Sequence, residues 1–167
     1  MTDIKRLTLG FAAFALVATQ GLGAATATGS LSATVTVSAM AKLTLSSATV
    51  TFPSADPDVS PSIAASEGPV TITAKGKTST GATISLTLIA ADDLLSGSGS
   101  IPISNVTWTA SGAGFVAGTM SRAAAQTVAS WTNSGNRTGT QSFALANSWD
   151  YAAGSYTTTA QYTLTAP

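Results

Sequence analysis

The sequence contains no cysteine and no histidine, and only 8% of its 167 residues are charged. Without cysteine there can be no disulfide, no thiolate nucleophile and no zinc–sulfur site. Without histidine there can be neither a Ser-His-Asp triad nor an imidazole metal site. Lysine plus arginine equals aspartate plus glutamate at seven each, so we expect no nucleic-acid partner. These absences indicate a protein that is not an enzyme and that carries no cofactor and no metal.

What the sequence does contain is small, uncharged and β-branched residues. Serine and threonine together number 50, close to a third of the chain. The length is that of one domain, since domains commonly run to ~100–200 residues. This composition is typical of a threonine-rich scaffold.

The first residues have the pattern of a secretory signal peptide. Lys5 and Arg6 precede an apolar run over residues 7–17, and Ala25-Thr26-Ala27 provides an A-x-A cleavage site. The apolar run is too short for a transmembrane anchor, which needs ~20 residues. We therefore predict a signal peptide over residues 1–27, and a secreted mature protein without a membrane span.

Beyond this leader, apolar and polar residues alternate with a period of two. Val70, Ile72 and Ala74 alternate with threonine and lysine, and the same pattern recurs at residues 84–88, 106–109 and 156–166. β-branched and aromatic residues on this period predict half-buried strands. Short strands separated by turn-forming clusters predict an all-β sandwich.

The alternation is longest over residues 31–45, where every odd position is apolar. Fifteen extended residues would span about 50 Å, against ~17–20 Å for a usual strand. One interpretation is a strand that switches sheets near residues 39–42. The other is an arm, ending near Ala41, that completes a neighbouring subunit. The residues alone leave both interpretations open.

Three stretches resemble the major subunits of colonization-factor-type chaperone–usher fimbriae, the Cys-free α-clade pilins. Residues 32–45 are similar to the N-terminal extension and first strand of that family. Residues 84–108 look like its core hairpin, and residues 153–164 resemble its C-terminal strand. Gly154 stands fourteen residues from the C-terminus, as in the wider pilin pattern, whereas Ala166 replaces a common penultimate tyrosine.

This resemblance implies an immunoglobulin-like sandwich that lacks its last strand and receives a donor strand from the next subunit. The implied divisions are a signal peptide (1–27), a donor-strand arm (28–41) and a pilin-like sandwich domain (42–167). The implied partners are the chain itself, as a head-to-tail homopolymer, a periplasmic chaperone and an outer-membrane usher. The product would be a cell-surface filament, exported through the periplasm, that could also serve in adhesion.

The resemblance also assigns residues to the two halves of the joint. The donor side chains would be Leu31, Ala33, Val35, Val37 and Ala39. The acceptor groove, bordered by residues 43–52 and 156–166, and the chaperone contact would use Tyr156, Ala160, Tyr162, Leu164 and Pro167. Ordinary core packing is an open alternative for the tyrosines, because aromatic residues routinely fill sandwich cores.

A second resemblance is to the Gram-positive wall-binding domains named for two W-x-L motifs. The corresponding positions here read Ile84-Ser85-Leu86 and Tyr162-Thr163-Leu164, without either tryptophan. The alternative function is therefore a monomeric secreted β-sandwich that binds carbohydrate or cell wall. Trp131 and Trp149 are candidates for stacking on a sugar, whereas Trp108 lies within an alternating run and is expected in the core.

Two pairs of carboxylates are candidates for sites of chemistry. Asp92 and Asp93 are adjacent, so on a strand their side chains would point to opposite faces. Asp56 and Asp58 lie in a proline-flanked loop without EF-hand spacing. We expect both pairs to be solvated loop charges, with no catalytic residues and no metal ligands.

Overall fold

The computed structural model describes residues 26–167, so nearly all of the predicted signal peptide lies outside the described residues. The described residues belong to two parts: residues 26–35, and a compact unit of residues 36–167. Among the residues that the structure describes, no helix is long and apolar enough to cross a membrane.

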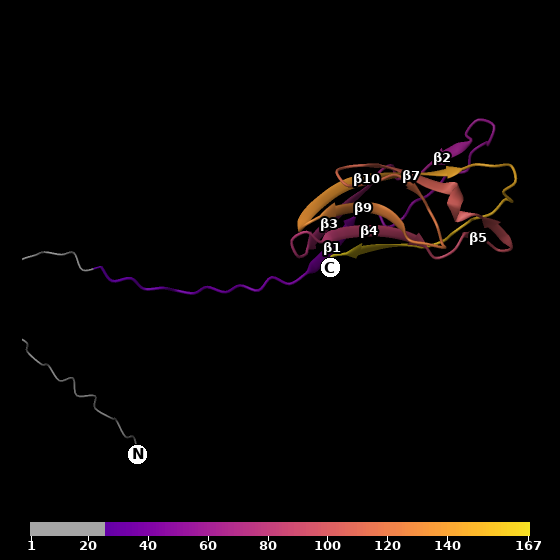
Figure 1. Ribbon diagram of the computed structural model, residues 1–167. Helices are drawn as coiled ribbons and strands as arrows, with labels where there is room; N and C mark the ends of the chain where they lie inside the picture. Colours follow the sequence, from indigo (N-terminus) through magenta and orange to yellow (C-terminus); the bar gives the residue numbers. More distant parts are fainter. Residues whose placement is uncertain (1–25) are drawn as a thin grey trace, which may run out of the picture. The chain divides into compact units, whose positions relative to one another are not determined.

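The compact unit consists of short strands and one 3-10 turn (Figure 1). The elements, in chain order, are β1 (Met40–Leu45), β2 (Ser62–Ala64), β3 (Val70–Lys77), β4 (Thr83–Ala90), β5 (Leu94–Ser96), β6 (Gly99–Ile101), η1 (Ile103–Asn105), β7 (Val106–Ser111), β8 (Gly118–Thr119), β9 (Gln126–Thr132), β10 (Gly135–Ala146) and β11 (Ala160–Thr165). The prediction of an all-β fold is confirmed.

The strands form two main antiparallel sheets. The larger has the order β1-β3-β10-β7-β8, with β2 paired to the end of β10. The smaller has the order β11-β4-β9, and β5 and β6 form a separate hairpin. In β3 the apolar positions are buried and the positions between them are not, as the alternation predicts.

The core lies between the two sheets and receives side chains from both. Ile72 of β3 and Ile84 and Leu86 of β4 are fully buried. Trp108 of β7 is also buried, and its indole Nε1 donates to the carbonyl oxygen of Val116 at 2.9 Å. This tryptophan is in the core, as its place in an alternating run predicts.

The register defines two ends of the sandwich. Met40 is opposite Lys77, and Gly76 is opposite Gly135. The starts of β1 and β10 therefore lie beside the last residues of β3, at the end of the sandwich that we call the proximal end. Ala146 is opposite Ser62 at the other, distal end, where β10 finishes. The chain therefore enters the sandwich at the proximal end, at Met40.

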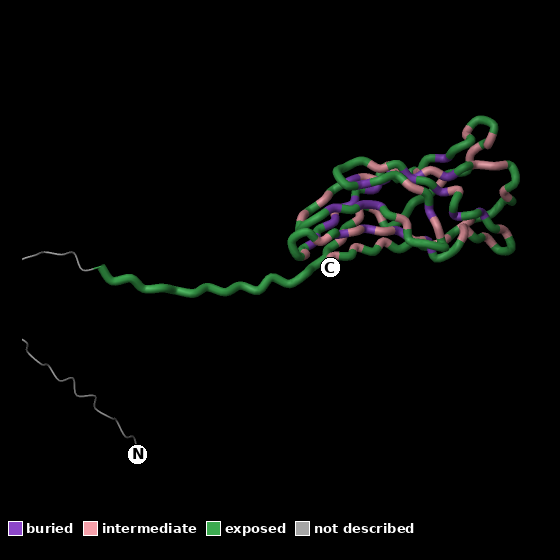
Figure 2. Tube along the Cα trace, in the orientation of Figure 1, coloured by how far each residue is buried: buried purple, intermediate pink, exposed green. Residues whose placement is uncertain are grey.

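Residues 26–39 belong to no strand, and every one of them is exposed (Figure 2). The alternating segment over residues 31–45 is thus a strand only from Met40 onward. Met40 and Ala41, the last residues of the predicted arm, pair with Lys77 and Gly76 in β1. The described residues before Met40 contribute nothing to either sheet.

Candidate functional site

The two sheets have free edges formed by β1 and β11. Within the part of the chain that the structure describes, β11 pairs only with β4, and β1 pairs only with β3. The first strand and the last strand are thus the edges of opposite sheets on one side of the sandwich. An edge strand presents unpaired backbone N–H and C=O groups to any extended chain that reaches it.

The ladder shows which backbone groups of β11 face the free side. Ala91 N donates to the carbonyl oxygen of Thr159 at 2.8 Å. In this antiparallel register, the odd-numbered residues of β11 therefore form the hydrogen bonds with β4. The N–H and C=O groups of Ala160, Tyr162 and Leu164 therefore point away from β4. These three residues form the open edge.

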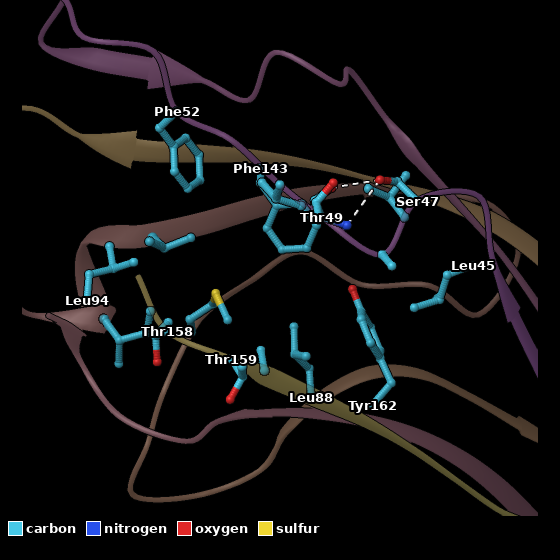
Figure 3. A pocket seen from close by; sticks show the side chains of 17 residues that line it. Leu45, Ser47, Thr49, Phe52, Leu88, Leu94, Phe143, Thr158, Thr159 and Tyr162 are labelled. Carbon is cyan, nitrogen blue, oxygen red and sulfur yellow. Dashed lines mark hydrogen bonds between the residues drawn. The ribbon is translucent and has the colours of Figure 1, made fainter. Parts of the chain in front are cut away.

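A cavity of about 420 Å³ lies between the sheets beside these edges (Figure 3). Its wall includes Leu45 at the end of β1, residues 47–50 and Phe52, which follow β1, and residues 158–160 and Tyr162 of the last segment. The floor is formed by core side chains: Val70, Leu88, Leu94, Ile103, Val106, Met120 and Phe143. A 150 Å³ apolar cavity is enough to bind benzene, so this space can receive several apolar side chains.

The cavity exists because the chain leaves the larger sheet after β1. The last ladder contact is Ser46 N to the carbonyl oxygen of Thr71, at 2.9 Å. Ser47 and Thr49 then form a local turn, in which Ser47 Oγ donates to Thr49 O and accepts from Thr49 N. Thr51 N donates to the Glu67 carboxylate at 2.8 Å, and hydrogen bonds from Thr51 lower the pKa of that carboxyl. Residues 47–52 are thus fixed without pairing to a strand.

Tyr162 carries the main polar contact beside the cavity. Its hydroxyl donates to Oε1 of Gln141, a fully buried side chain of β10 in the opposite sheet. Burial raises the pKa of the Tyr162 phenol above its usual range. Gln141 Nε2 has no partner among the described residues, so the hydroxyl of Tyr162 provides the only hydrogen bond to this side chain there.

The predicted donor residues are exposed. Leu31 is 95% exposed, Val35 84% and Val37 67%, and both Ala33 and Ala39 are exposed as well. Large apolar side chains in this state have no folded partner within the described residues. An apolar side chain gains ~1.5–3 kcal/mol on full burial, so a partner surface would be strongly favoured.

The structure divides the predicted groove residues into two groups. Ala160 and Tyr162 line the cavity, and Leu164 is half-buried against the core farther along β11. Tyr156 lies before β11, and its hydroxyl donates to the carbonyl oxygen of Ala152 at 2.8 Å. Pro167 lies beyond β11, where its carbonyl oxygen accepts from the Thr78 hydroxyl. Only Ala160 and Tyr162 are thus brought together at the cavity.

The borders predicted for the groove, residues 43–52 and 156–166, include the residues of the cavity wall, but sequence reasoning missed the floor of the cavity. Leu94, Met120 and Phe143 come from segments far apart in the chain, and no spacing joins them. No signal in the sequence places these three side chains together.

The other sequence candidates do not form a common site. Trp108 and Trp131 are buried, whereas Trp149 is 69% exposed, so the three indoles make no shared stacking platform. Asp92 and Asp93 both lie within 4.0 Å of the Arg122 guanidinium. Within the described part of the chain, no group of three or more acidic side chains is placed to hold a metal ion.

The chain was compared with known proteins at three levels. No protein-family model, no curated protein and no solved structure matches it. The site is therefore interpreted from its geometry and chemistry.

Replacing Tyr162 with phenylalanine removes the hydroxyl on which Gln141 depends. We expect Tyr162→Phe to lower the free energy of unfolding by about 1–3 kcal/mol, because a buried amide is left without its partner. Urea denaturation followed by tryptophan fluorescence measures this change. Tyr156→Phe is the matched control, since its hydroxyl bonds a single carbonyl near the surface; an equal loss in both variants would contradict the assignment.

The raised pKa of Tyr162 predicts a loss of stability at alkaline pH. The unfolded chain ionises this phenol near pH 10, whereas the folded chain keeps it neutral to a higher pH. Its contribution is therefore complete below pH 10 and decreases as the pH rises above that value. Between about pH 8 and pH 11.5, the free energy of unfolding should decrease more steeply with pH for the wild type than for Tyr162→Phe. Equal slopes for the two proteins would show that Tyr162 ionises as freely in the folded chain as in the unfolded one.

Proposed function

We propose that this protein is a structural subunit of an extracellular filament. The arm of one copy inserts into the cavity between β1 and β11 of the next copy and completes its sandwich. One observation carries the proposal: a single chain holds both an apolar cavity beside two free strand edges and an exposed segment with alternating apolar residues.

The arm has the chemistry that the cavity requires. An inserted strand can pair its backbone with the open groups of Ala160, Tyr162 and Leu164, which is β-augmentation. Because side chains alternate across a strand, the odd residues of the arm would all face the cavity while the serines and threonines face solvent. Burial of Leu31, Val35 and Val37 would contribute ~5–9 kcal/mol before ordering costs.

The direction of insertion follows from where the arm begins. The sandwich takes its own arm at the proximal end, at Met40. An incoming arm that runs antiparallel to β11 would finish at the distal end, so its own domain would lie there. Each copy then has one neighbour at each end. Such a head-to-tail joint is heterologous and propagates as an open filament.

The wider assignment follows the resemblance to α-clade pilins. It comprises an immunoglobulin-like fold completed by donor-strand exchange, a signal peptide, and a periplasmic chaperone that occupies the cavity during export. An outer-membrane usher would then pass the subunits to the cell surface. An exposed apolar cavity would need to be covered by such a chaperone, because free strand edges and apolar surface favour aggregation.

The second candidate function is a monomeric sandwich that binds carbohydrate or cell wall. The structure offers it less support, since Ile84 and Leu86 are fully buried and Tyr162 faces the cavity. These residues present no outer surface to a ligand. In a monomeric binding protein, the exposed apolar residues of the arm would also have no function.

A charge placed on the inward face of the arm should stop polymerisation. We expect Val35→Asp to leave a folded, exportable subunit that forms no filaments, because insertion would bury an unpaired carboxylate. Negative-stain electron microscopy and the yield of sedimentable polymer measure the effect.

Thr36→Asp is the matched control for this experiment. It adds the same charge to the neighbouring residue, on the face that would point to solvent. We expect filament yield close to wild type from this variant. Wild-type yield from Val35→Asp, or equal loss from both variants, would contradict strand insertion in this register.

A further inference from the structure

The charged side chains of the sandwich are segregated between its two ends. Among the described residues, four of the five cationic side chains lie near the proximal end: Lys42, Lys75, Lys77 and Arg137. All six acidic side chains lie toward the distal end, in loops that follow or precede strands there: Asp56, Asp58, Glu67, Asp92, Asp93 and Asp150. The balanced net charge of the sequence conceals this polarity.

The proximal cations are crowded on neighbouring strands. Lys42 of β1 lies directly opposite Lys75 of β3, and both side chains are exposed together with Lys77. Arg137, the third residue of β10, stacks over the Trp131 ring, with its guanidinium carbon 5.8 Å from the ring centroid. Like charges in directly opposite positions destabilise a sheet. This arrangement therefore lowers the stability of the isolated subunit, and an anionic partner would relieve the repulsion.

The distal end presents a fixed indole beside carboxylates. Trp149 is 69% exposed, and its Nε1 donates to Asp58 Oδ1 at 3.1 Å. The loop that carries Asp58 is held in place, because Asn147 Nδ2 donates to the carbonyl oxygens of Ala55 and Ser60. An exposed indole face next to a carboxylate suits a lysine or arginine side chain through both cation–π and ionic attraction.

These two sets of charges are not paired within the subunit. Across the described residues, the only ion pairs within 4.0 Å join Arg122 to Asp92 and Asp93. The twelve residues of β10 separate the ends by about 40 Å, several times the ~8 Å screening length at physiological salt. The proximal cations and the distal carboxylates can therefore meet only between molecules.

We propose that the cationic proximal end of one subunit docks on the anionic distal end of the next, around Trp149 and Asp58. The occupant of this surface is a second copy of the chain. This inference rests on the proposed filament, in which antiparallel insertion of the arm brings these two ends together. Arm insertion links the subunits, and the contact between ends steers their encounter and orients the joint.

Zero-length crosslinking of assembled filaments tests this contact. Filaments grown from an equal mixture of ¹⁴N- and ¹⁵N-labelled chains would be treated with a carbodiimide, which joins a lysine amine to a carboxylate only where the two touch. We expect isopeptide bonds from Lys75 or Lys77 to Asp58 or Asp150, and half of the crosslinked pairs should join one light and one heavy peptide. The distance between these lysines and carboxylates within one chain excludes an intramolecular crosslink.

Charge neutralisation provides the kinetic test. We expect Lys75→Gln/Lys77→Gln to slow polymerisation at low salt by about tenfold, and to weaken its dependence on salt, because electrostatic steering accelerates association by ~10–10³-fold. Thr127→Glu/Ser130→Glu is the control, since it changes the net charge equally at exposed positions in the middle of β9. We expect this control to polymerise at nearly the wild-type rate.

The outcomes separate this contact from strand insertion. Normal filaments without crosslinks between the ends, and with equal rates for both double variants, would overturn the end contact and leave arm insertion intact. If Lys75→Gln/Lys77→Gln still forms crosslinks through Lys42, the result would support the contact and identify Lys42 as a proximal residue that makes it. A wild-type chain that forms no polymer would overturn both proposals together.

Discussion

The open edge of β11 beside an apolar cavity is the constraint on which the rest of the molecule depends. Ala160, Tyr162 and Leu164 direct their backbone groups away from β4, and the cavity adjoins them. Among the described residues, no strand other than β4 pairs with β11. The described chain instead carries its unpaired alternating segment before β1, at the other end of the sequence.

The core and the cavity have different roles in this account. Residues such as Ile72, Ile84 and Trp108 are buried by the subunit itself and hold the two sheets together. Phe143, Leu88 and Tyr162 belong to the same core but also line the cavity. An inserted strand would therefore extend an existing core rather than build a separate interface. Such a joint resembles the interior of a domain, where close packing makes dissociation slow.

Because alternation is a local signal, the sequence alone predicts β3, β4 and β7. It does not mark β9 or the first half of β10, and the strand predicted over residues 156–166 begins only at Ala160. It cannot show where β1 begins, since the alternation runs without a break from Leu31 to Leu45 and only pairing with β3 marks Met40. The cavity was only partly predictable: Phe52 and Tyr162 lie in the predicted borders of the groove, but Leu94 and Met120 come to it through tertiary packing. The separation of charges is equally invisible, because it depends on the antiparallel register that places Lys42 beside Lys75.

Hydrogen exchange at individual amides of β11 tests the central claim most directly. In the unassembled chain, the amides of Ala160, Tyr162 and Leu164 should exchange quickly, while those of Gln161 and Thr163, which face β4, exchange slowly. In filaments, all five amides should be protected, because an incoming strand supplies the missing carbonyl oxygens. Equal exchange at Tyr162 and Leu164 before and after assembly would contradict the claim that a neighbouring chain completes the sheet.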